Sequence, residues 1–267
     1  MIAKSSAAAG RRAPRAGGAL DRSVFLRPIA HRGLHDRSSG RIENTAPAFL
    51  AAIAKNYGIE CDLQAAKDGT PMVFHDASLH RLVGLPGPLA GHTSAALARL
   101  RYRGRDARIL PFADLLDLVG GRVPLLVEVK VNGDPPNTFL DKIARLARAY
   151  NDPIALMSFN ADVVAELGRL APMIPRGLIA GTHQLRPSLL AAPRAATRSK
   201  MLDRILGTAP SGIAFFAIDV RMLRGARAWM SRHAPELALF SWTIRTARER
   251  ASAAKWADAP IFEGYEA

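Results

Sequence analysis

The stretch IECDLQAAKDGTPMVFHD, residues 59–76, decides the fold of this chain. IECDLQ alternates in character, so Glu60 and Asp62 point to one side of a strand while its apolar side chains point to the other. The apolar side suits packing against helices, which leaves two carboxylates facing a barrel interior. Burying two adjacent carboxylates is costly because each loses water and the two repel. A divalent cation bound by both carboxylates would remove both costs. The alternative is that the two carboxylates lie on the surface, on an edge strand.

The second half of this stretch predicts a hairpin. The DG pair at 68–69 is a turn signal. PMVFHD (71–76) is therefore expected to return antiparallel to IECDLQ as an extra strand outside the barrel. A one-residue slip in this register changes which side chains share a face. With the turn centred on the DG pair, the expected cross-strand neighbours are Gln64 with Val73 and Asp62 with His75.

The rest of the chain alternates short β-rich runs with longer helical stretches, which predicts a parallel sheet. Eight such strands in 267 residues favour an α/β fold, a TIM-type (β/α)8 barrel with the hairpin strand after its second strand. A doubly wound open sheet is the alternative. The expected strands are 24–30, 59–64, 125–129, 154–159, 176–180, 213–219, 237–243 and 260–264, and the expected helices are 46–56, 111–119, 138–150, 161–170, 187–206, 222–233 and 247–257.

Length and composition predict one large domain. We expect residues 23–267 to form a single barrel domain and the basic, small-residue-rich segment 1–22 to be a disordered arm. The arm lacks the apolar region of a secretory signal, although its composition leaves a transit peptide open. Cys61 is the one cysteine, which excludes an internal disulfide and favours a cytoplasmic location. No apolar run approaches the roughly 18 residues of a membrane span.

The formal charge of +14 raises the question of a nucleic-acid partner. Thirty of the 37 basic residues are arginines spread along most of the chain, and only 6% of residues are aromatic, so stacking platforms are scarce. We therefore expect no specific nucleic-acid ligand. The charge reflects an arginine-rich composition that also attracts anionic substrates. The oligomeric state is not indicated by the sequence.

A third carboxylate lies in LLVEVK, residues 125–130. Glu128 and Lys130 share one face of this strand, either as an internal ion pair or as a metal ligand beside a lysine that neutralises phosphate charge. Together with Glu60 and Asp62, Glu128 completes a set of three hard oxygen ligands. Such a set suits Mg²⁺ or Ca²⁺ better than zinc.

Two histidines are candidates for proton transfer. His31 follows the first expected strand and His75 ends PMVFHD. Both are expected at the rim where barrel enzymes hold their catalytic residues, and imidazole suits proton transfer near neutral pH. We expect the other five histidines in loops or on the surface.

Residues near these histidines extend the candidate site. Arg32 suits a phosphate oxygen through a charge-assisted hydrogen bond. Glu43 either orients Arg32 or a ligand, or simply favours the amino end of the helix that follows. Asn44 or Thr45 is expected to cap that helix.

The chain contains, in this order, the motifs HRG (31–33), ENT (43–45), E-x-D (60–62), DG (68–69), HD (75–76), E-V-K (128–130), SF (158–159) and SWT (241–243). This ordered set resembles the motifs of the glycerophosphodiester phosphodiesterases, a family of phospholipase-C-like phosphodiesterases. The similarity covers about residues 24–246. Two departures are Ile42, where members usually have proline, and KWADAPIFEGYEA (255–267), which replaces an acidic, glycine-rich closing block.

This resemblance implies metal-dependent hydrolysis of small glycerophosphodiesters to glycerol 3-phosphate and an alcohol, with acid–base catalysis by two histidines. A related barrel phosphodiesterase that cleaves lysophospholipids or phospholipids, phospholipase D-like or C-like, is the alternative. A further alternative is a non-catalytic protein that binds nucleic acids or anionic surfaces. The residues that match family positions are Glu60, Asp62 and Glu128 for the metal, His31 and His75 for acid–base catalysis, Arg32, Lys130 and Trp242 for the substrate, and Glu43 and Asn44 for support of the site.

Overall fold

The computed structural model describes residues 18–133, 135–184 and 202–267. Most of the disordered arm that the sequence predicts over residues 1–22 lies outside the described residues. The described end of this segment is part of the fold, because Leu20 is buried and packs into a core cluster inside the barrel.

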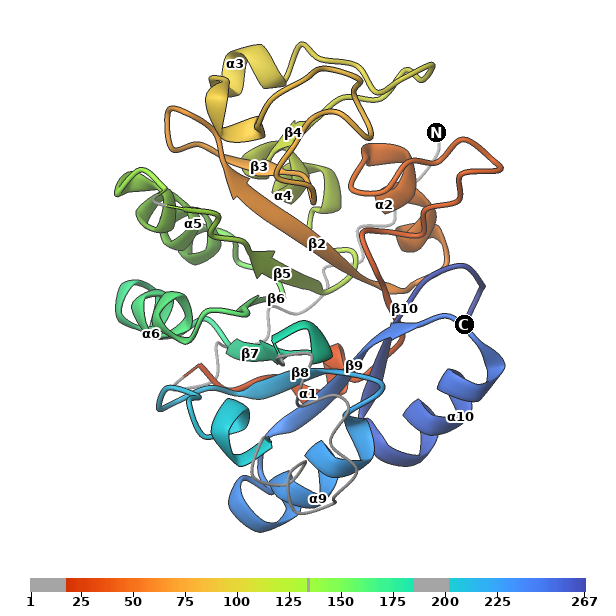
Figure 1. The fold of residues 1–267 in the computed structure, drawn as a ribbon, viewed down its shortest axis with the longest axis vertical. Coiled ribbons are helices and arrows are strands. Elements are labelled where there is room, and N and C mark those ends of the chain that lie inside the picture. Colours follow the sequence, from red (N-terminus) through yellow and green to blue (C-terminus); the bar gives the residue numbers. More distant parts are fainter. Residues whose placement is uncertain (1–17, 134, 185–201) are drawn as a thin grey trace, which may run out of the picture.

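Eight parallel strands form a closed barrel, since β1 (Ile29–Ala30) pairs with both β2 (Gly58–Ala65) and β10 (Ala259–Phe262). Helices surround the barrel (Figure 1). The predicted TIM-type barrel is confirmed. The other barrel strands are β5 (Leu125–Val129), β6 (Ile154–Ser158), β7 (Arg176–Ala180), β8 (Phe215–Asp219) and β9 (Ala238–Ile244).

The predicted helices within the described residues are present, with ends that differ by at most two residues. The helix expected at 187–206 lies mostly outside the described residues, and residues 202–206 are helical. No helix in the described part of the chain has both the length and the apolar character to cross a bilayer. The helices are α1 (Arg22–Phe25), α2 (Ala46–Ala54), α3 (Ser94–Leu97), α4 (Phe112–Val119), α5 (Thr138–Ala149), α6 (Ala161–Leu170), α9 (Leu223–His233) and α10 (Ala247–Trp256), with short 3₁₀ turns η1 (Leu89–Gly91) and η2 (Thr182–Gln184).

The first predicted strand, 24–30, is wrong over most of its length. Its beginning belongs to α1, and only the two residues of β1 are extended. Asp21 starts the helix because its carboxylate accepts a hydrogen bond from the amide of Ser23 at 3.1 Å. Phe25 of this helix is buried in the cluster that fills the barrel interior.

The hairpin forms, but its register differs by one residue from the predicted one. β3 (Pro71–Val73) runs antiparallel to β2. Gln64 pairs with Met72 rather than with Val73. Asp62 likewise lies beside Phe74 rather than His75, because the amide of Phe74 donates to the carbonyl of Asp62 at 3.0 Å.

The turn explains this shift. The amide of Gly69 donates to the carbonyl of Ala66 at 2.9 Å, so the central residues of the turn are Lys67 and Asp68. Gly69 follows with a φ of 71°, the left-handed conformation that a longer hairpin loop requires after its turn. The DG pair therefore marks the end of the turn rather than its centre.

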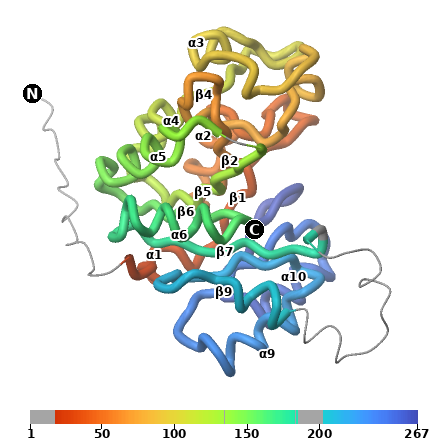
Figure 2. The backbone as a smooth tube through the Cα atoms, turned by 60° about the vertical axis from the view of Figure 1, so that its left-hand side comes forward, coloured from red at the N-terminus to blue at the C-terminus, as the bar shows by residue number. Residues whose placement is uncertain are grey.

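The chain between β3 and α4 forms an insertion outside the barrel, at the end of the molecule remote from α9 (Figures 1 and 2). Besides α3 it contains β4 (Leu110–Pro111), a two-residue strand that pairs with β3 and that the sequence did not predict. A separate apolar cluster holds the insertion together and includes Phe74 and Tyr102, whose ring centroids are 6.1 Å apart.

The two sides of each barrel strand face different surroundings. Cys61 of β2 packs among residues of the surrounding helices, as predicted, whereas Leu126 of β5 belongs to the cluster inside the barrel. The register of β2 with β5 places Glu60 beside Leu126 and Asp62 beside Glu128. The three carboxylates therefore share the interior side of two adjacent strands.

Candidate active site at the carboxyl end of the barrel

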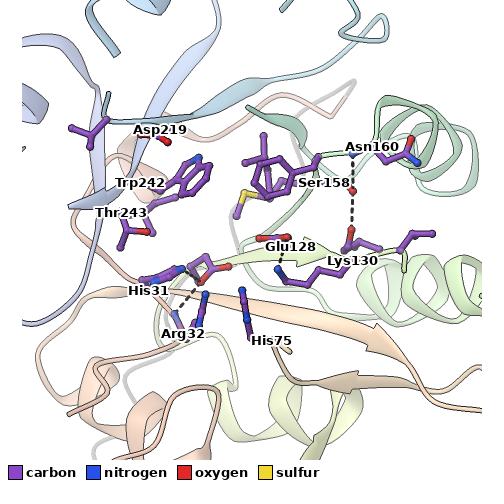
Figure 3. Close-up of a pocket in the computed structure, with 18 of the residues that line it drawn as sticks. His31, Arg32, His75, Glu128, Lys130, Ser158, Asn160, Asp219, Trp242 and Thr243 are labelled. Carbon is purple, nitrogen blue, oxygen red and sulfur yellow. Dashed lines mark hydrogen bonds and ion pairs between the residues drawn. The ribbon is translucent and has the colours of Figure 1, made fainter. Parts of the chain in front are cut away.

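A cavity of about 710 Å³ gathers most of the predicted site residues (Figure 3). Asp62 contacts residues of the lining, and Glu43 and Asn44 reach it through Arg32 and Asp62. The predicted site residues that line the cavity directly are His31, Arg32, Glu60, His75, Glu128, Lys130 and Trp242.

The three carboxylates form one cluster. Oxygen atoms of Glu60, Asp62 and Glu128 lie within 4.8 Å of one another, and all three residues are buried. The ammonium of Lys130 lies 3.2 Å from Oδ1 of Asp62 and 3.0 Å from Oε1 of Glu128. The Glu128–Lys130 ion pair is thus real, and it is also part of the acidic cluster.

Burial and mutual repulsion raise the pKa values of two of the three carboxylates in this cluster. Burial, and then the charges of Asp62 and Glu128, raise the pKa of Glu60 well above its usual range. Burial and Asp62 likewise raise the pKa of Glu128 to about 7, against the opposing effect of Lys130. Burial acts the same way on Asp62, but Lys130 and Arg32 outweigh it and lower the pKa of Asp62 below its usual range.

The cluster suits a divalent cation. Oδ1 of Asp62 is buried and receives no hydrogen bond from the described residues, although it lies within ion-pair distance of Lys130. A buried acceptor oxygen that receives no hydrogen bond and lies among three carboxylates is suited to bind a metal ion. The all-oxygen donor set of Glu60, Asp62 and Glu128 fits Mg²⁺ or Ca²⁺.

The HRG and ENT segments support the cluster from two tight turns. Arg32 and Asn44 have φ values of 55° and 56°, which are strained for residues other than glycine. The amide of Asn44 donates to the carbonyl of Arg32 at 2.9 Å and joins the turns. From these positions the amide of Arg32 donates to Glu60 at 2.9 Å and the side chain of Asn44 donates to Asp62 at 2.8 Å. The two left-handed residues therefore each direct a hydrogen-bond donor at one carboxylate of the cluster.

His75 belongs to a chain of charged groups at the cavity edge. Its Nδ1 lies 2.8 Å from Oδ1 of Asp76. Arg81 donates to Asp76 and, through both terminal nitrogens, to Glu43. Glu43 also accepts a hydrogen bond from Arg32 at 2.7 Å. Glu43 thus contacts Arg32, the arginine that it was predicted to orient, and the role itself stays a prediction.

Aromatic and apolar side chains form another part of the lining. The indole nitrogen of Trp242 donates to the carbonyl of Ala217 at 3.0 Å, and its ring meets Phe159 edge-on with centroids 5.5 Å apart. Met157 and Ile179 also line the cavity. Trp242 therefore lines this cavity and also packs at the mouth of the barrel.

Sequence reasoning missed several residues of the site. Glu263 lies 2.5 Å from Nδ1 of His31, and His35, which was expected in a loop or on the surface, lies in a loop and 3.4 Å from the same carboxylate. Asp219 and Ser158 also line the cavity. Each of Asp219, Ser158 and Glu263 lies at or just after the carboxyl end of a barrel strand, and that position was the available signal.

Known proteins with a similar sequence point to one family. Residues 31–262 match the Glycerophosphoryl diester phosphodiesterase family. The chain is 32% identical over 162 residues to the uncharacterized protein YqiK of Bacillus subtilis, which is 57% of this chain and 65% of that protein. It is 28% identical over 193 residues to the probable glycerophosphodiester phosphodiesterase 1 of Mycobacterium tuberculosis, with 63% and 69% covered. The matched segment thus spans about two thirds of each relative.

A solved structure has the same fold. A phosphodiesterase from Oleispira antarctica, determined in complex with the product sn-glycerol-3-phosphate, superposes with a TM-score of 0.64 at 19% identity over 89% of this chain and 92% of that chain.

The family match includes HRG, ENT, E-x-D, HD and E-V-K, so it confirms the resemblance that these motifs indicated. The chain belongs to the glycerophosphoryl diester phosphodiesterase family.

Proposed function

We propose that this protein hydrolyses glycerophosphodiesters to glycerol 3-phosphate and an alcohol, with the help of Mg²⁺ or Ca²⁺. The observation that carries the proposal is the convergence of three buried carboxylates, two histidines and two cationic side chains on one cavity. Membership of the family supports the reaction class. The glycerol 3-phosphate bound by the Oleispira phosphodiesterase supports the product.

Glu60, Asp62 and Glu128 are the residues that would hold the metal. When bound, the metal supplies Lewis-acid polarisation of a phosphate oxygen. Lys130 and Arg32 bind the phosphate oxygens and stabilise the negative charge that develops at phosphorus. Asn44 and Glu43 keep Asp62 and Arg32 oriented through the hydrogen bonds described above.

His31 and His75 move the protons. One imidazole removes a proton from the attacking oxygen, and the other protonates the departing alcohol. The attacking oxygen belongs either to water or to the neighbouring glycerol hydroxyl, which gives a cyclic phosphate first. Trp242 and the apolar lining beside it hold the part of the substrate that does not react.

We expect residues 23–267 to act as one phosphodiesterase domain. The cytoplasmic location suggested by the single cysteine stays a prediction.

The test measures glycerol 3-phosphate and alcohol released from glycerophosphocholine and glycerophosphoethanolamine, with Mg²⁺, Ca²⁺ or EDTA. Metal-dependent turnover that Glu60→Ala abolishes would support the reaction and the ligand assignment together. A matched control is Glu166→Ala, because Glu166 lies on the exposed side of α6 and pairs only with Arg169 among the described contacts.

A parallel assay with micellar lysophosphatidylcholine tests the alternative, in which the enzyme cleaves lysophospholipids. Turnover of the lysolipid without turnover of either soluble diester would replace the proposed substrate class. Wild-type protein that binds metal and cleaves none of these substrates would contradict the proposal altogether.

A further inference from the structure

His31 and Glu263 meet at the seam where the barrel closes. In the pairing of β1 with β10, Ala30 lies beside Phe262, and the amide of His31 donates to the carbonyl of Phe262 at 2.9 Å. His31 and Glu263, the residues that directly follow these two strands, are therefore held side by side. Nδ1 of His31 lies 2.5 Å from Oε2 of Glu263, and the two side chains are only 12% and 18% exposed.

Glu263 is held as a carboxylate by two further side chains. Nε of Arg245 donates to its Oε1 at 2.6 Å, and Nε2 of His35 lies 3.4 Å from its Oε2. Burial opposes ionisation, but hydrogen bonds from His31 and His35 and the charge of Arg245 keep the pKa of Glu263 well below its usual range. An ionised carboxylate can only accept hydrogen bonds. The shared proton therefore lies on Nδ1 of His31.

We propose that Glu263 is the positioning residue for His31. It fixes the tautomer with the proton on Nδ1 and leaves Nε2 as the nitrogen that exchanges protons with the substrate. Nε2 lies on the other side of the ring, 3.9 Å from Oε2 of Glu60 and therefore beside the acidic cluster. The inference rests on the proposed function, because that function assigns His31 its role in proton transfer.

Arg245 makes the Glu263→Gln variant a sharp test. Arg245 is a donor only, so the amide oxygen of the variant turns toward Arg245 and the amide NH₂ group turns toward His31. Nδ1 must then accept, and the ring proton moves to Nε2. We expect kcat to fall by about 100-fold. KM should stay within about threefold, because Glu263 does not line the cavity that holds the substrate.

Two variants should restore activity. Glu263→Asp keeps the charge and should be more active than Glu263→Gln. Adding Arg245→Ala to Glu263→Gln frees the amide to turn its oxygen toward His31, so the double variant should exceed the single Glu263→Gln variant in kcat. Glu266→Gln is the matched control and should keep the wild-type kcat, since Glu266 pairs with the exposed Lys55 at 2.8 Å.

The ¹⁵N chemical shifts of the His31 ring report the tautomer without any turnover. At about pH 8 the wild type should carry the proton on Nδ1 and Glu263→Gln should carry it on Nε2; a His31→Gln variant assigns the signals. An unprotonated Nδ1 in the wild type, or an unchanged tautomer in Glu263→Gln, would overturn the inference. If the wild type cleaves no glycerophosphodiester, the proposed function fails while these shifts still decide the role of Glu263.

Discussion

The Nζ atom of Lys130 lies 3.2 Å from Oδ1 of Asp62, a buried oxygen that receives no hydrogen bond from the described residues. Lys130, together with Arg32, therefore partly neutralises the acidic cluster when no metal is bound. The same ammonium lines the cavity, where we propose that a substrate phosphate binds. This double contact links the stability of the metal-free protein to its activity.

Lys130→Met should impair both properties. Removal of one phosphate-binding charge is expected to lower kcat by about 100- to 1000-fold in a glycerophosphocholine assay. In EDTA the variant should also unfold more easily than the wild type, because Asp62 and Glu128 lose their counter-ion. Lys130→Arg keeps the charge and should recover most of the stability. Equal stability of Lys130→Met and wild type in EDTA would contradict this account.

Glu60→Gln should change stability in opposite directions with and without metal. In EDTA the variant relieves repulsion among three carboxylates, so its unfolding free energy should equal or exceed that of the wild type. At a metal concentration 100 times Kd, the wild type gains about 2.7 kcal/mol, or roughly 5–10 °C in Tm, and the variant should gain far less. Thermal denaturation measures both effects, and Glu166→Gln should respond to metal as the wild type does.

Glu43 should make the folded state sensitive to acid. Burial opposes its ionisation, but hydrogen bonds from Arg81 and the charge of Arg32 lower the pKa of Glu43 from 4.5 to about 2. Its contribution to stability is therefore complete above pH 4.5 and is lost as the pH falls toward about 2. The size of this contribution is at most about 3 kcal/mol.

Urea unfolding at several pH values below 5 tests this dependence. Glu43→Gln should be less stable than the wild type at neutral pH and should lose less stability on acidification. Glu236→Gln, at an exposed turn, should keep the wild-type slope. Parallel pH profiles for Glu43→Gln and wild type would show that Glu43 does not carry the effect.

Gly69→Ala should destabilise the hairpin. Gly69 has a φ of 71°, and an added Cβ would lie 2.4 Å from Oγ1 of Thr138. Strain and contact together should cost more than about 1 kcal/mol in unfolding free energy. Gly104→Ala is the matched control, since Gly104 has a φ of 63° and no described atom within 4 Å of the added Cβ. The difference between the two variants in denaturant unfolding isolates the contact with Thr138.

Trp242 should affect KM as well as stability. Trp242→Ala removes the contact with Phe159 and the hydrogen bond to Ala217, so we expect a loss of about 3 kcal/mol in unfolding free energy and a higher KM. Trp242→Phe should be intermediate. Trp229→Ala serves as the control, because Trp229 packs on Phe216 outside the cavity lining and should lower stability without changing KM. An unchanged KM in Trp242→Ala would remove this residue from the substrate site.

Local pattern was sufficient for the barrel and for the chemistry of its acidic cluster. The alternation in IECDLQ and LLVEVK is a property of the extended backbone itself, which turns successive side chains to opposite faces. Glu60 and Asp62 therefore share one face of their strand whatever strand lies beside it, and the register with β5 adds Glu128 to that face. Prediction was wrong where a local signal pointed elsewhere. Asp21 caps a helix that overlaps the beginning of the first expected strand, and Gly69 is the left-handed residue after the hairpin turn rather than part of its centre.

The sequence by itself thus determined the fold class, the identity of the acidic cluster and the two histidines beside it. Only the tertiary structure decided which carboxylate meets His31. Glu263 lies 232 residues further along the chain, and the two become neighbours because the first and last barrel strands pair. No period or turn signal reports that contact, since strand order and register at the closing seam depend on how the whole barrel packs around its core.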